Sequence, residues 1–370
     1  MTEKSTHMRA EIDETSDALA RQLSANAPRI EKIGERLTAL APPLVVTIAR
    51  GSSDHCALYL KYLVEIELGV PCASIGPSIA SLYHAPLRLG GSAAVSISQS
   101  GRSPDIVEMQ RAARRGGALT IAFVNEVASP LASEAEALAP LWAGREQSVA
   151  ATKSMIAGLV AGASLVAAWH DDATLSAGLT GLPQLLREQK APPSEAMVET
   201  LASAKTAFVL GRGATFGIAA EAALKLKETC AIHAEAYSSA EVLHGPAELV
   251  EPGFLVIAFM PRDAAREGME KTLRRLANAG ARVLRVGGRR RRCGQHSRRR
   301  ADGLAVARAD PDDPSLLWIG GDGRAQPRAR PRQSAKYTQG DGDGLMQVLA
   351  GARIFDDERF LDDRMVKIGR

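Results

Sequence analysis

Three side chains in the second half of the chain are suited to moving protons. Lys225 and Glu228 stand three residues apart in an alanine-rich segment that is predicted to be helical, so they share one helix face. His244 precedes Gly245 and Pro246, which mark a turn. A carboxylate and an imidazole are common general acid–base groups. Taken singly, a helical Lys/Glu pair is typical of a surface ion pair, and a loop histidine is typical of a solvated side chain.

Polar side chains in the first half are suited to holding a phosphate group. Ser98, Gln99 and Ser100 follow an apolar run. Ser103 is a predicted helix N-cap, because Pro104 favours the first helical position. Hydroxyls and backbone amides would converge at the positive end of that helix, where anions bind. Capping alone also explains a serine-rich turn, so both interpretations stay open at this point.

The proton-transfer residues and the phosphate-binding residues both lie in a chain that alternates repeatedly between predicted strands and helices. Short apolar runs predict strands at 44–49, 93–97, 118–124, 207–210, 254–259 and 281–286. Helices are predicted at 57–68 and 218–230. Near-continuous apolar strands between helices favour an α/β fold with parallel sheets covered on both faces. Two similar turns indicate an internal duplication, Arg50-Gly51-Ser52-Ser53 and Arg212-Gly213-Ala214-Thr215.

The domain organisation follows from shifts in composition. We predict an N-terminal helical lead-in at 1–40, a first domain at 41–180, a linker and connecting helix at 181–200, a second domain at 201–286, a basic low-order segment at 287–345 and an extra segment at 346–370. Glycine and proline place the linker itself between Leu179 and Pro193. Residues 287–300 include seven arginines, and the segment lacks the apolar surface that would offset its ordering entropy.

Composition and missing motifs exclude several classes of protein. The formal net charge is +4, but no nucleic-acid signature accompanies the basic tail, which we interpret as a solvated linker rather than a nucleic-acid arm. The longest apolar run, 155–169, is shorter than the roughly 20 residues that span a bilayer, so it predicts a buried helix. Phe216 replaces the third glycine of a dinucleotide motif. The four cysteines lack metal-ligand spacing. We therefore expect a cytoplasmic protein without membrane contact, metal or organic cofactor.

Six short motifs, in order and with natural spacing, resemble the double SIS (sugar isomerase) domain family. This family includes the isomerase half of glutamine:fructose-6-phosphate aminotransferase and stand-alone amino-sugar-phosphate deaminases. The motifs occupy residues 51–53, 98–101, 149–153, 223–228, 232–237 and 244–246. The resemblance covers about residues 8–286. It implies two three-layer α/β domains with parallel sheets flanked by helices, the second of them incomplete.

The resemblance also implies a sugar 6-phosphate site and the role of each residue in it. The phosphate-binding positions match Ser53, Ser98, Gln99, Ser100 and Ser103. Val149 matches a backbone contact to the sugar, and Glu228 matches the base that moves a proton between C1 and C2. Lys225 matches its catalytic neighbour. His244 matches the ring-opening residue, which the adjacent subunit of a homodimer supplies.

The start of the chain reduces the number of reactions that we expect within this family. The chain begins Met1-Thr2 and not with a glutaminase domain, so we expect chemistry with free ammonia. The first interpretation is an isomerising glucosamine-6-phosphate deaminase, which forms fructose 6-phosphate and ammonia. The alternatives are the reverse synthase reaction and, from another class, a non-catalytic sugar-phosphate sensor. The motifs do not distinguish gluco from galacto substrates.

The end of the chain departs from the family pattern. Members of this family end in a segment with Pro, Leu, Lys and Val, whose lysine belongs to the active site. We do not recognise this segment in the sequence after Val286. Residues 349–363 resemble the start of N-acetylglucosamine-6-phosphate deacetylases. We interpret this tail as a frameshift that runs into a neighbouring amino-sugar gene.

Overall fold

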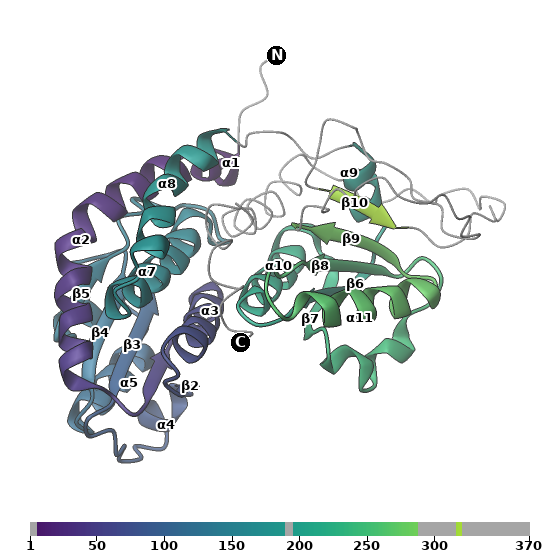
Figure 1. Cartoon of the computed structure of the whole chain (residues 1–370). Helices are drawn as coiled ribbons and strands as arrows, with labels where there is room; N and C mark the ends of the chain where they lie inside the picture. Colours follow the sequence, from purple (N-terminus) through teal and green to yellow (C-terminus); the bar gives the residue numbers. More distant parts are fainter. Residues whose placement is uncertain (1–5, 189–194, 288–315, 320–370) are drawn as a thin grey trace. The chain divides into compact units, whose positions relative to one another are not determined.

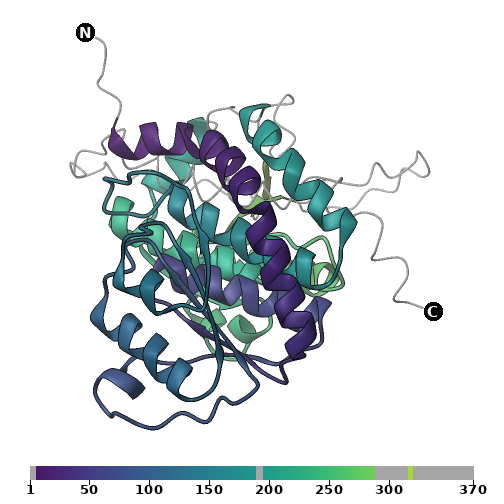
Figure 2. The ribbon, with the colours of Figure 1, turned by 90° about the vertical axis from the view of Figure 1, so that its left-hand side faces the viewer.

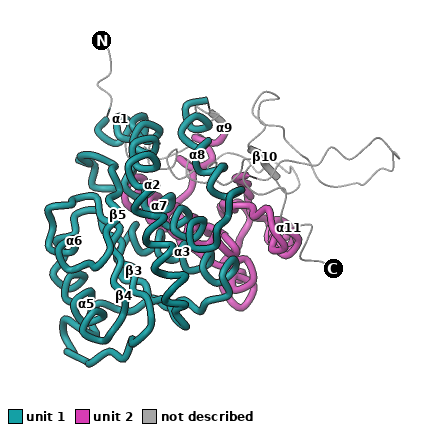
Figure 3. Tube along the Cα trace, turned by 60° about the vertical axis from the view of Figure 1, so that its left-hand side comes forward, with its two compact units in different colours: residues 1–190 teal, residues 191–370 magenta. Residues whose placement is uncertain are grey.

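The chain folds into two compact units, residues 1–190 and 191–370 (Figures 1 and 3). The computed structural model describes residues 6–188, 195–287 and 316–319. Each unit contains one five-stranded sheet. The boundary between the units falls within the predicted linker at 181–200.

The sheet of unit 1 is parallel throughout, in the order β2-β1-β3-β4-β5. Its strands are β1 (Val45–Ile48), β2 (Cys72–Ser74), β3 (Ala93–Ser98), β4 (Leu119–Val124) and β5 (Ala137–Pro140). Every residue of β1 and β3 is buried, as expected for central strands that are covered on both faces. The predicted strands at 44–49, 93–97 and 118–124 are confirmed.

Helices cover both faces of this sheet. The α3 helix (Ser52–Glu67) connects β1 to β2, and α5 (Pro104–Arg115) connects β3 to β4. Right-handed crossovers that leave the two central strands in opposite directions put these helices on opposite faces. Two short helices, α4 (Ser78–Ser81) and α6 (Pro130–Glu134), pack beside α5, whereas α7 (Lys153–Trp169) packs against α3. The result is the three-layer unit that the sequence predicts.

The N-terminal segment forms two helices, α1 (His7–Asp13) and α2 (Thr15–Leu40), which confirms the helical lead-in over the described residues. Helix α2 packs along α7 and along α8 (Ala173–Glu188) (Figure 2). Gly34 permits this approach, because a Cβ atom there would lie 2.9 Å from the carbonyl carbon of Ala168. Nearly all of α7 is buried, as predicted for 155–169. In the described part of the chain, no helix is long and apolar enough to span a membrane.

The predicted start of the linker, Leu179, is wrong, because the chain is still helical there. Helix α8 continues through Gly181 and Pro183 to Glu188. Buried apolar side chains on α8, including Leu182, hold this segment against unit 1 despite the two helix-disfavouring residues. Packing therefore outweighs local propensity here.

Unit 2 repeats the strand order of unit 1. Its elements are α9 (Glu195–Ala202), β6 (Thr206–Gly211), α10 (Thr215–Cys230), β7 (His233–Ser238), η1 (Glu241–Leu243), η2 (Pro246–Leu249), β8 (Leu255–Phe259), α11 (Arg266–Asn278), β9 (Arg282–Val286) and β10 (Leu316–Ile319). The sheet order is β10-β9-β8-β6-β7, so β6 and β8 are the central pair, as β1 and β3 are in unit 1. This shared order is what the predicted duplication requires.

The segment at 287–345 contains strand β10, which pairs antiparallel with β9. The composition of this segment predicts no strand there. The rest of that segment beyond Gly287, the segment at 346–370 and the position of the missing C-terminal lysine lie outside the described residues. The frameshift interpretation therefore stays a prediction.

Candidate functional site

The predicted phosphate-binding residues lie at one edge of the unit 1 sheet. Strands β1 and β3 are adjacent and parallel, and their connections leave in opposite directions. Open α/β sheets bind their ligands at the carboxyl ends of such a pair of strands. Ser53 follows β1, and residues 98–103 follow β3. The topology thus brings the two segments to the edge where a ligand is expected.

The turn after β3 is fixed by its own serines and by one glycine. The Gly101 amide donates to Ser98 Oγ at 3.0 Å, and the Arg102 amide donates to Ser100 Oγ at 3.3 Å. Gly101 has φ = +61°, and a Cβ atom there would lie 2.2 Å from Ser129 Oγ. Only glycine fits this position, because both the backbone angle and the space exclude a side chain.

Two helix N-termini face this edge of the sheet. Ser53 lies in the first turn of α3, and Ser103 is the N-cap residue of α5 with Pro104 after it, as predicted. The Ser103 side chain makes no capping hydrogen bond, so in this respect it differs from an ordinary cap. An ion pair between Arg50 and Asp105 ties the loop after β1 to the first turn of α5.

The charges around this edge favour an anion. Arg50 and Arg102 are exposed, and the carboxylate of Asp105 is paired with Arg50. Burial raises the pKa of the Asp54 carboxyl in the first turn of α3, against the opposing charge of His55. Burial therefore disfavours the ionised form of Asp54. We call the segment formed by Ser53 and residues 98–103 the phosphate cradle.

The equivalent edge of unit 2 is built differently. Its loop after β8 carries Asp263, whose Oδ1 accepts a hydrogen bond from the Ala265 amide at 2.8 Å. The loop after β6 carries Arg212, whose guanidinium donates to Ser238 Oγ at 3.0 Å. The Asp263 carboxylate already binds a backbone amide just before α11, where a phosphate would otherwise bind. Unit 1 is therefore the better site for a phosphate.

Helix α10 buries an ionic cluster that includes two predicted site residues. The Lys225 ammonium lies 3.0 Å from Glu221 Oε1 and 2.7 Å from Glu228 Oε2. The side chains of Lys225 and Glu221 are 1% exposed, whereas that of Glu228 is 33% exposed. Sequence reasoning missed Glu221, although its position four residues before Lys225 on the same face could have signalled it. Glu228 is thus held through one oxygen and is accessible to solvent.

The other two predicted residues lie on exposed loops. His244 ends η1 in unit 2, and its backbone amide donates to the carbonyl of Glu241 at 2.9 Å. Gly245 follows with φ = +134°, a conformation that favours glycine. Val149 lies between β5 and α7 in unit 1 and is fully exposed.

Side chains that could ligate a metal ion are not clustered in the described ranges. No group of three or more His, Cys, Asp or Glu residues there is arranged to hold an ion. Burial raises the pKa of the Cys72 thiol to about 12, so the thiol is neutral at physiological pH.

Comparison with known proteins identifies the family. The model of the SIS domain matches residues 43–168 and 200–286. The glutamine–fructose-6-phosphate aminotransferase (isomerizing) of Pyrobaculum aerophilum is 35% identical over 286 residues, which are 74% of this chain and 46% of that protein. The chain therefore spans about half the length of the curated relatives it matches.

Solved structures agree with this assignment. A candidate phosphosugar isomerase from Silicibacter pomeroyi DSS-3 superposes with a TM-score of 0.75 and 38% identity, over 95% of this chain and 96% of that one. The C-terminal domain of glucosamine-fructose-6-phosphate aminotransferase from Francisella tularensis has a TM-score of 0.67 and 26% identity, over 76% and 83% of the two chains. With the family model matching more than half of its residues, the chain belongs to the SIS-domain family and is related to isomerising sugar-phosphate enzymes.

Proposed function

We propose that the chain converts glucosamine 6-phosphate and water into fructose 6-phosphate and ammonia. The observation that carries this proposal is the Glu228 carboxylate, which is anchored by a buried ammonium and whose side chain is 33% exposed. An anchored, accessible carboxylate is what a proton shuttle between two neighbouring carbons needs. The isomerising relatives support the same class of reaction.

The proposed reaction balances with two side chains and one water. His244 assists ring opening by moving a proton from the anomeric hydroxyl to the ring oxygen. Glu228 takes the proton from C2 of the open-chain aldehyde and returns it to C1, while a proton passes from the C2 amino group to the aldehyde oxygen. These transfers leave a hydroxyl at C1 and an imine at C2. Water adds to the imine, and ammonia leaves. Proton transfer of this kind contributes about 10²- to 10⁴-fold to a rate.

The phosphate cradle supplies binding energy away from the reacting carbons. The Ser53 and Ser103 hydroxyls and the backbone amides of the first turns of α3 and α5 are suited to a phosphate dianion. Fixing the phosphate orients the sugar, which lowers the entropic cost of reaching the transition state. Ser98 and Ser100 contribute by holding the shape of the turn.

Lys225 has two roles in this proposal. Its ammonium fixes one oxygen of Glu228. In the proposed reaction, its positive charge also stabilises the negative charge that develops on the substrate oxygen during enolisation. Glu221 supplies the countercharge that keeps the ammonium buried when Glu228 becomes protonated.

Two alternatives remain in the same framework. Run in reverse, the same residues would make glucosamine 6-phosphate from fructose 6-phosphate and ammonia. A non-catalytic sensor needs the phosphate cradle but has no use for a buried Lys225 that anchors an acid–base group. The cluster on α10 therefore favours an enzyme over a sensor.

Replacing Glu228 tests the proton shuttle. We expect Glu228→Gln to lower the release of ammonia and fructose 6-phosphate by about 10²- to 10⁴-fold, with sugar-phosphate affinity nearly unchanged. Coupled assays and calorimetry measure the two quantities. Glu267→Gln, at an exposed glutamate that pairs with Lys271, is the matched control and should keep full activity. Equal turnover in Glu228→Gln and the parent would remove Glu228 from the mechanism.

Replacing Lys225 tests the ionic cluster. We expect Lys225→Met to lower the free energy of unfolding by about 3–5 kcal/mol, because the buried Glu221 carboxylate loses this countercharge. Adding Glu221→Gln should recover most of this loss in urea denaturation, while turnover stays low because Glu228 still lacks its anchor. Full turnover in the stable double variant would show that Lys225 serves folding alone.

Mixing two inactive variants tests the source of His244. If each site of a homodimer combines Glu228 of one subunit with His244 of the other, co-refolding Glu228→Gln with His244→Asn gives one intact site per mixed dimer. Random pairing then restores about a quarter of the parental activity. If each subunit used its own His244, the mixture would recover no activity.

A further inference from the structure

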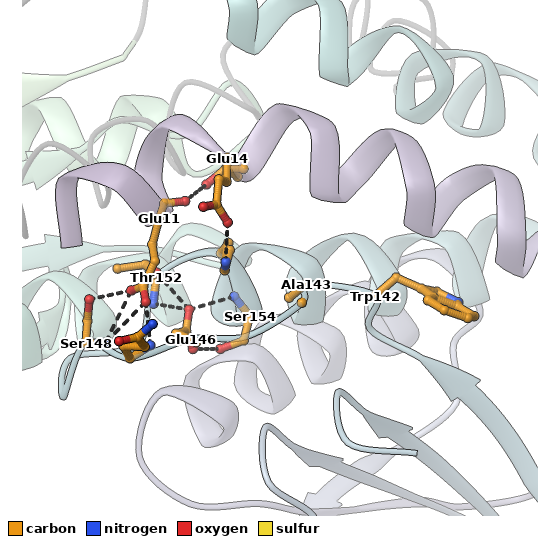
Figure 4. Close-up of polar contacts among 12 residues, drawn as sticks. Glu11, Glu14, Trp142, Ala143, Glu146, Ser148, Thr152 and Ser154 are labelled. Atoms are coloured by element: carbon orange, nitrogen blue, oxygen red, sulfur yellow. Dashed lines mark hydrogen bonds and ion pairs between the residues drawn. The ribbon is translucent and has the colours of Figure 1, made fainter. Parts of the chain in front are cut away.

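A buried carboxylate on helix α1 is hydrogen-bonded to a loop of unit 1 that is distant in the sequence. Glu11 is 5% exposed, and its carboxylate accepts hydrogen bonds from the amides of Gln147 and Ser148 (Figure 4). It also accepts from the Ser148 hydroxyl, and from Thr152 Oγ1 at 3.3 Å. More than 130 residues separate these partners in the sequence, so the bonds tie the N-terminal helix to the 146–152 loop.

The same loop has a second anchor at its other end. Glu146 accepts hydrogen bonds from the Thr152 amide at 2.9 Å and from the Ser154 amide at 3.1 Å, so it caps α7 in place of an N-cap side chain. This anchor is internal to the loop and its helix. In the described part of the chain, the hydrogen bonds to Glu11 hold the amides of residues 147 and 148 from outside the loop.

Val149 follows directly after the residues that Glu11 holds. Its side chain is fully exposed, and the amides of Gln147 and Ser148 just before it are bound to Glu11. Holding those two amides restricts the backbone dihedrals that set the direction of the next peptide groups. Glu11 thus fixes the two peptide planes that carry these amides, just before Val149.

Glu11 is ionised under working conditions. Burial acts to raise the pKa of its carboxyl, but the hydrogen bonds from Gln147, Ser148 and Thr152 outweigh burial and lower the pKa. Hydrogen bonds to an ionised acceptor are stronger than neutral ones. The ionised carboxylate therefore holds the amides of residues 147 and 148 more strongly than a neutral acceptor would.

We propose that Glu11 is a positioning residue for sugar binding: through the amides of Gln147 and Ser148 it fixes the loop that carries Val149, whose backbone the family resemblance assigns to a sugar contact. This inference rests on the proposed function for the identity of the ligand. It makes the N-terminal helix part of the sugar-binding apparatus, although no residue of that helix was a candidate on sequence grounds.

Hydrogen exchange tests the structural half of the proposal without any substrate. We expect Glu11→Ala to speed exchange of the Gln147 and Ser148 amides at least about tenfold, since each loses a charge-assisted bond. The Thr152 and Ser154 amides, which Glu146 holds, should keep their protection. Asp13→Asn is the control, because Asp13 lies on the same helix and pairs only weakly with exposed Arg9. Unchanged exchange at Gln147 and Ser148 would overturn the proposal.

Kinetics and binding test its functional half. We expect Glu11→Ala to raise KM for glucosamine 6-phosphate about tenfold, which corresponds to one lost hydrogen bond of about 1.4 kcal/mol. The inhibition constant of inorganic phosphate, which needs only the cradle, should stay the same. Glu11→Gln, which keeps one acceptor oxygen, should fall between the parent and Glu11→Ala.

The outcomes separate the two claims. A parental KM in Glu11→Ala, or weakened binding of inorganic phosphate to the same extent as the sugar phosphate, would overturn the positioning role. If the parent does not turn over glucosamine 6-phosphate, the proposed function fails. The same comparison is then made with fructose 6-phosphate binding by calorimetry, where an equal affinity in Glu11→Ala and the parent overturns the positioning role.

Discussion

The handedness of the strand connections is the constraint on which both units depend. Because crossovers between parallel strands are right-handed, a chain that leaves two adjacent central strands in opposite directions must place its helices on opposite faces. The carboxyl ends of β1 and β3 then present two helix N-termini to one edge of the sheet. No single side chain creates this arrangement, which we propose binds the substrate phosphate. The side chains decide only which of the two equivalent edges uses it, and Asp263 in unit 2 disfavours that edge.

Buried carboxylates carry out the positioning in this protein. Glu221 keeps a buried ammonium in place beside Glu228, and Glu11 orders a loop through its backbone amides. Burying a charge is costly unless it is paired or hydrogen-bonded, and both carboxylates meet that requirement. Each also acts on a residue that is itself exposed, Glu228 in one unit and Val149 in the other. Rigid, buried polar contacts thus support accessible groups.

Strands could be predicted best from the sequence where both faces of the strand are buried. The central strand β8 is a continuous apolar run and β3 is nearly so, interrupted by Ser96, and their bounds could be predicted closely. Edge strands were missed, because β2 has two exposed residues out of three and β7 alternates polar with apolar residues. The linker was misplaced because glycine and proline inside α8 are outweighed by packing that only the folded unit supplies. Glu11 and Glu221 were missed for a related reason: a glutamate in a helix is typical of a solvated face. The spacing of Glu221 and Lys225 indicates an ion pair, but only tertiary contacts show that Glu11 and Glu221 are buried.

The fate of the hydrogen on C2 of the substrate tests the central claim most directly. In the proposed reaction Glu228 removes this hydrogen, so glucosamine 6-phosphate deuterated at C2 should react more slowly than the unlabelled sugar, with a primary isotope effect. The label should then be found at C1 of fructose 6-phosphate or in the solvent. Tight binding of the sugar phosphate with the label fully retained on C2 of the recovered glucosamine 6-phosphate would contradict proton transfer between C1 and C2 as the function of this chain.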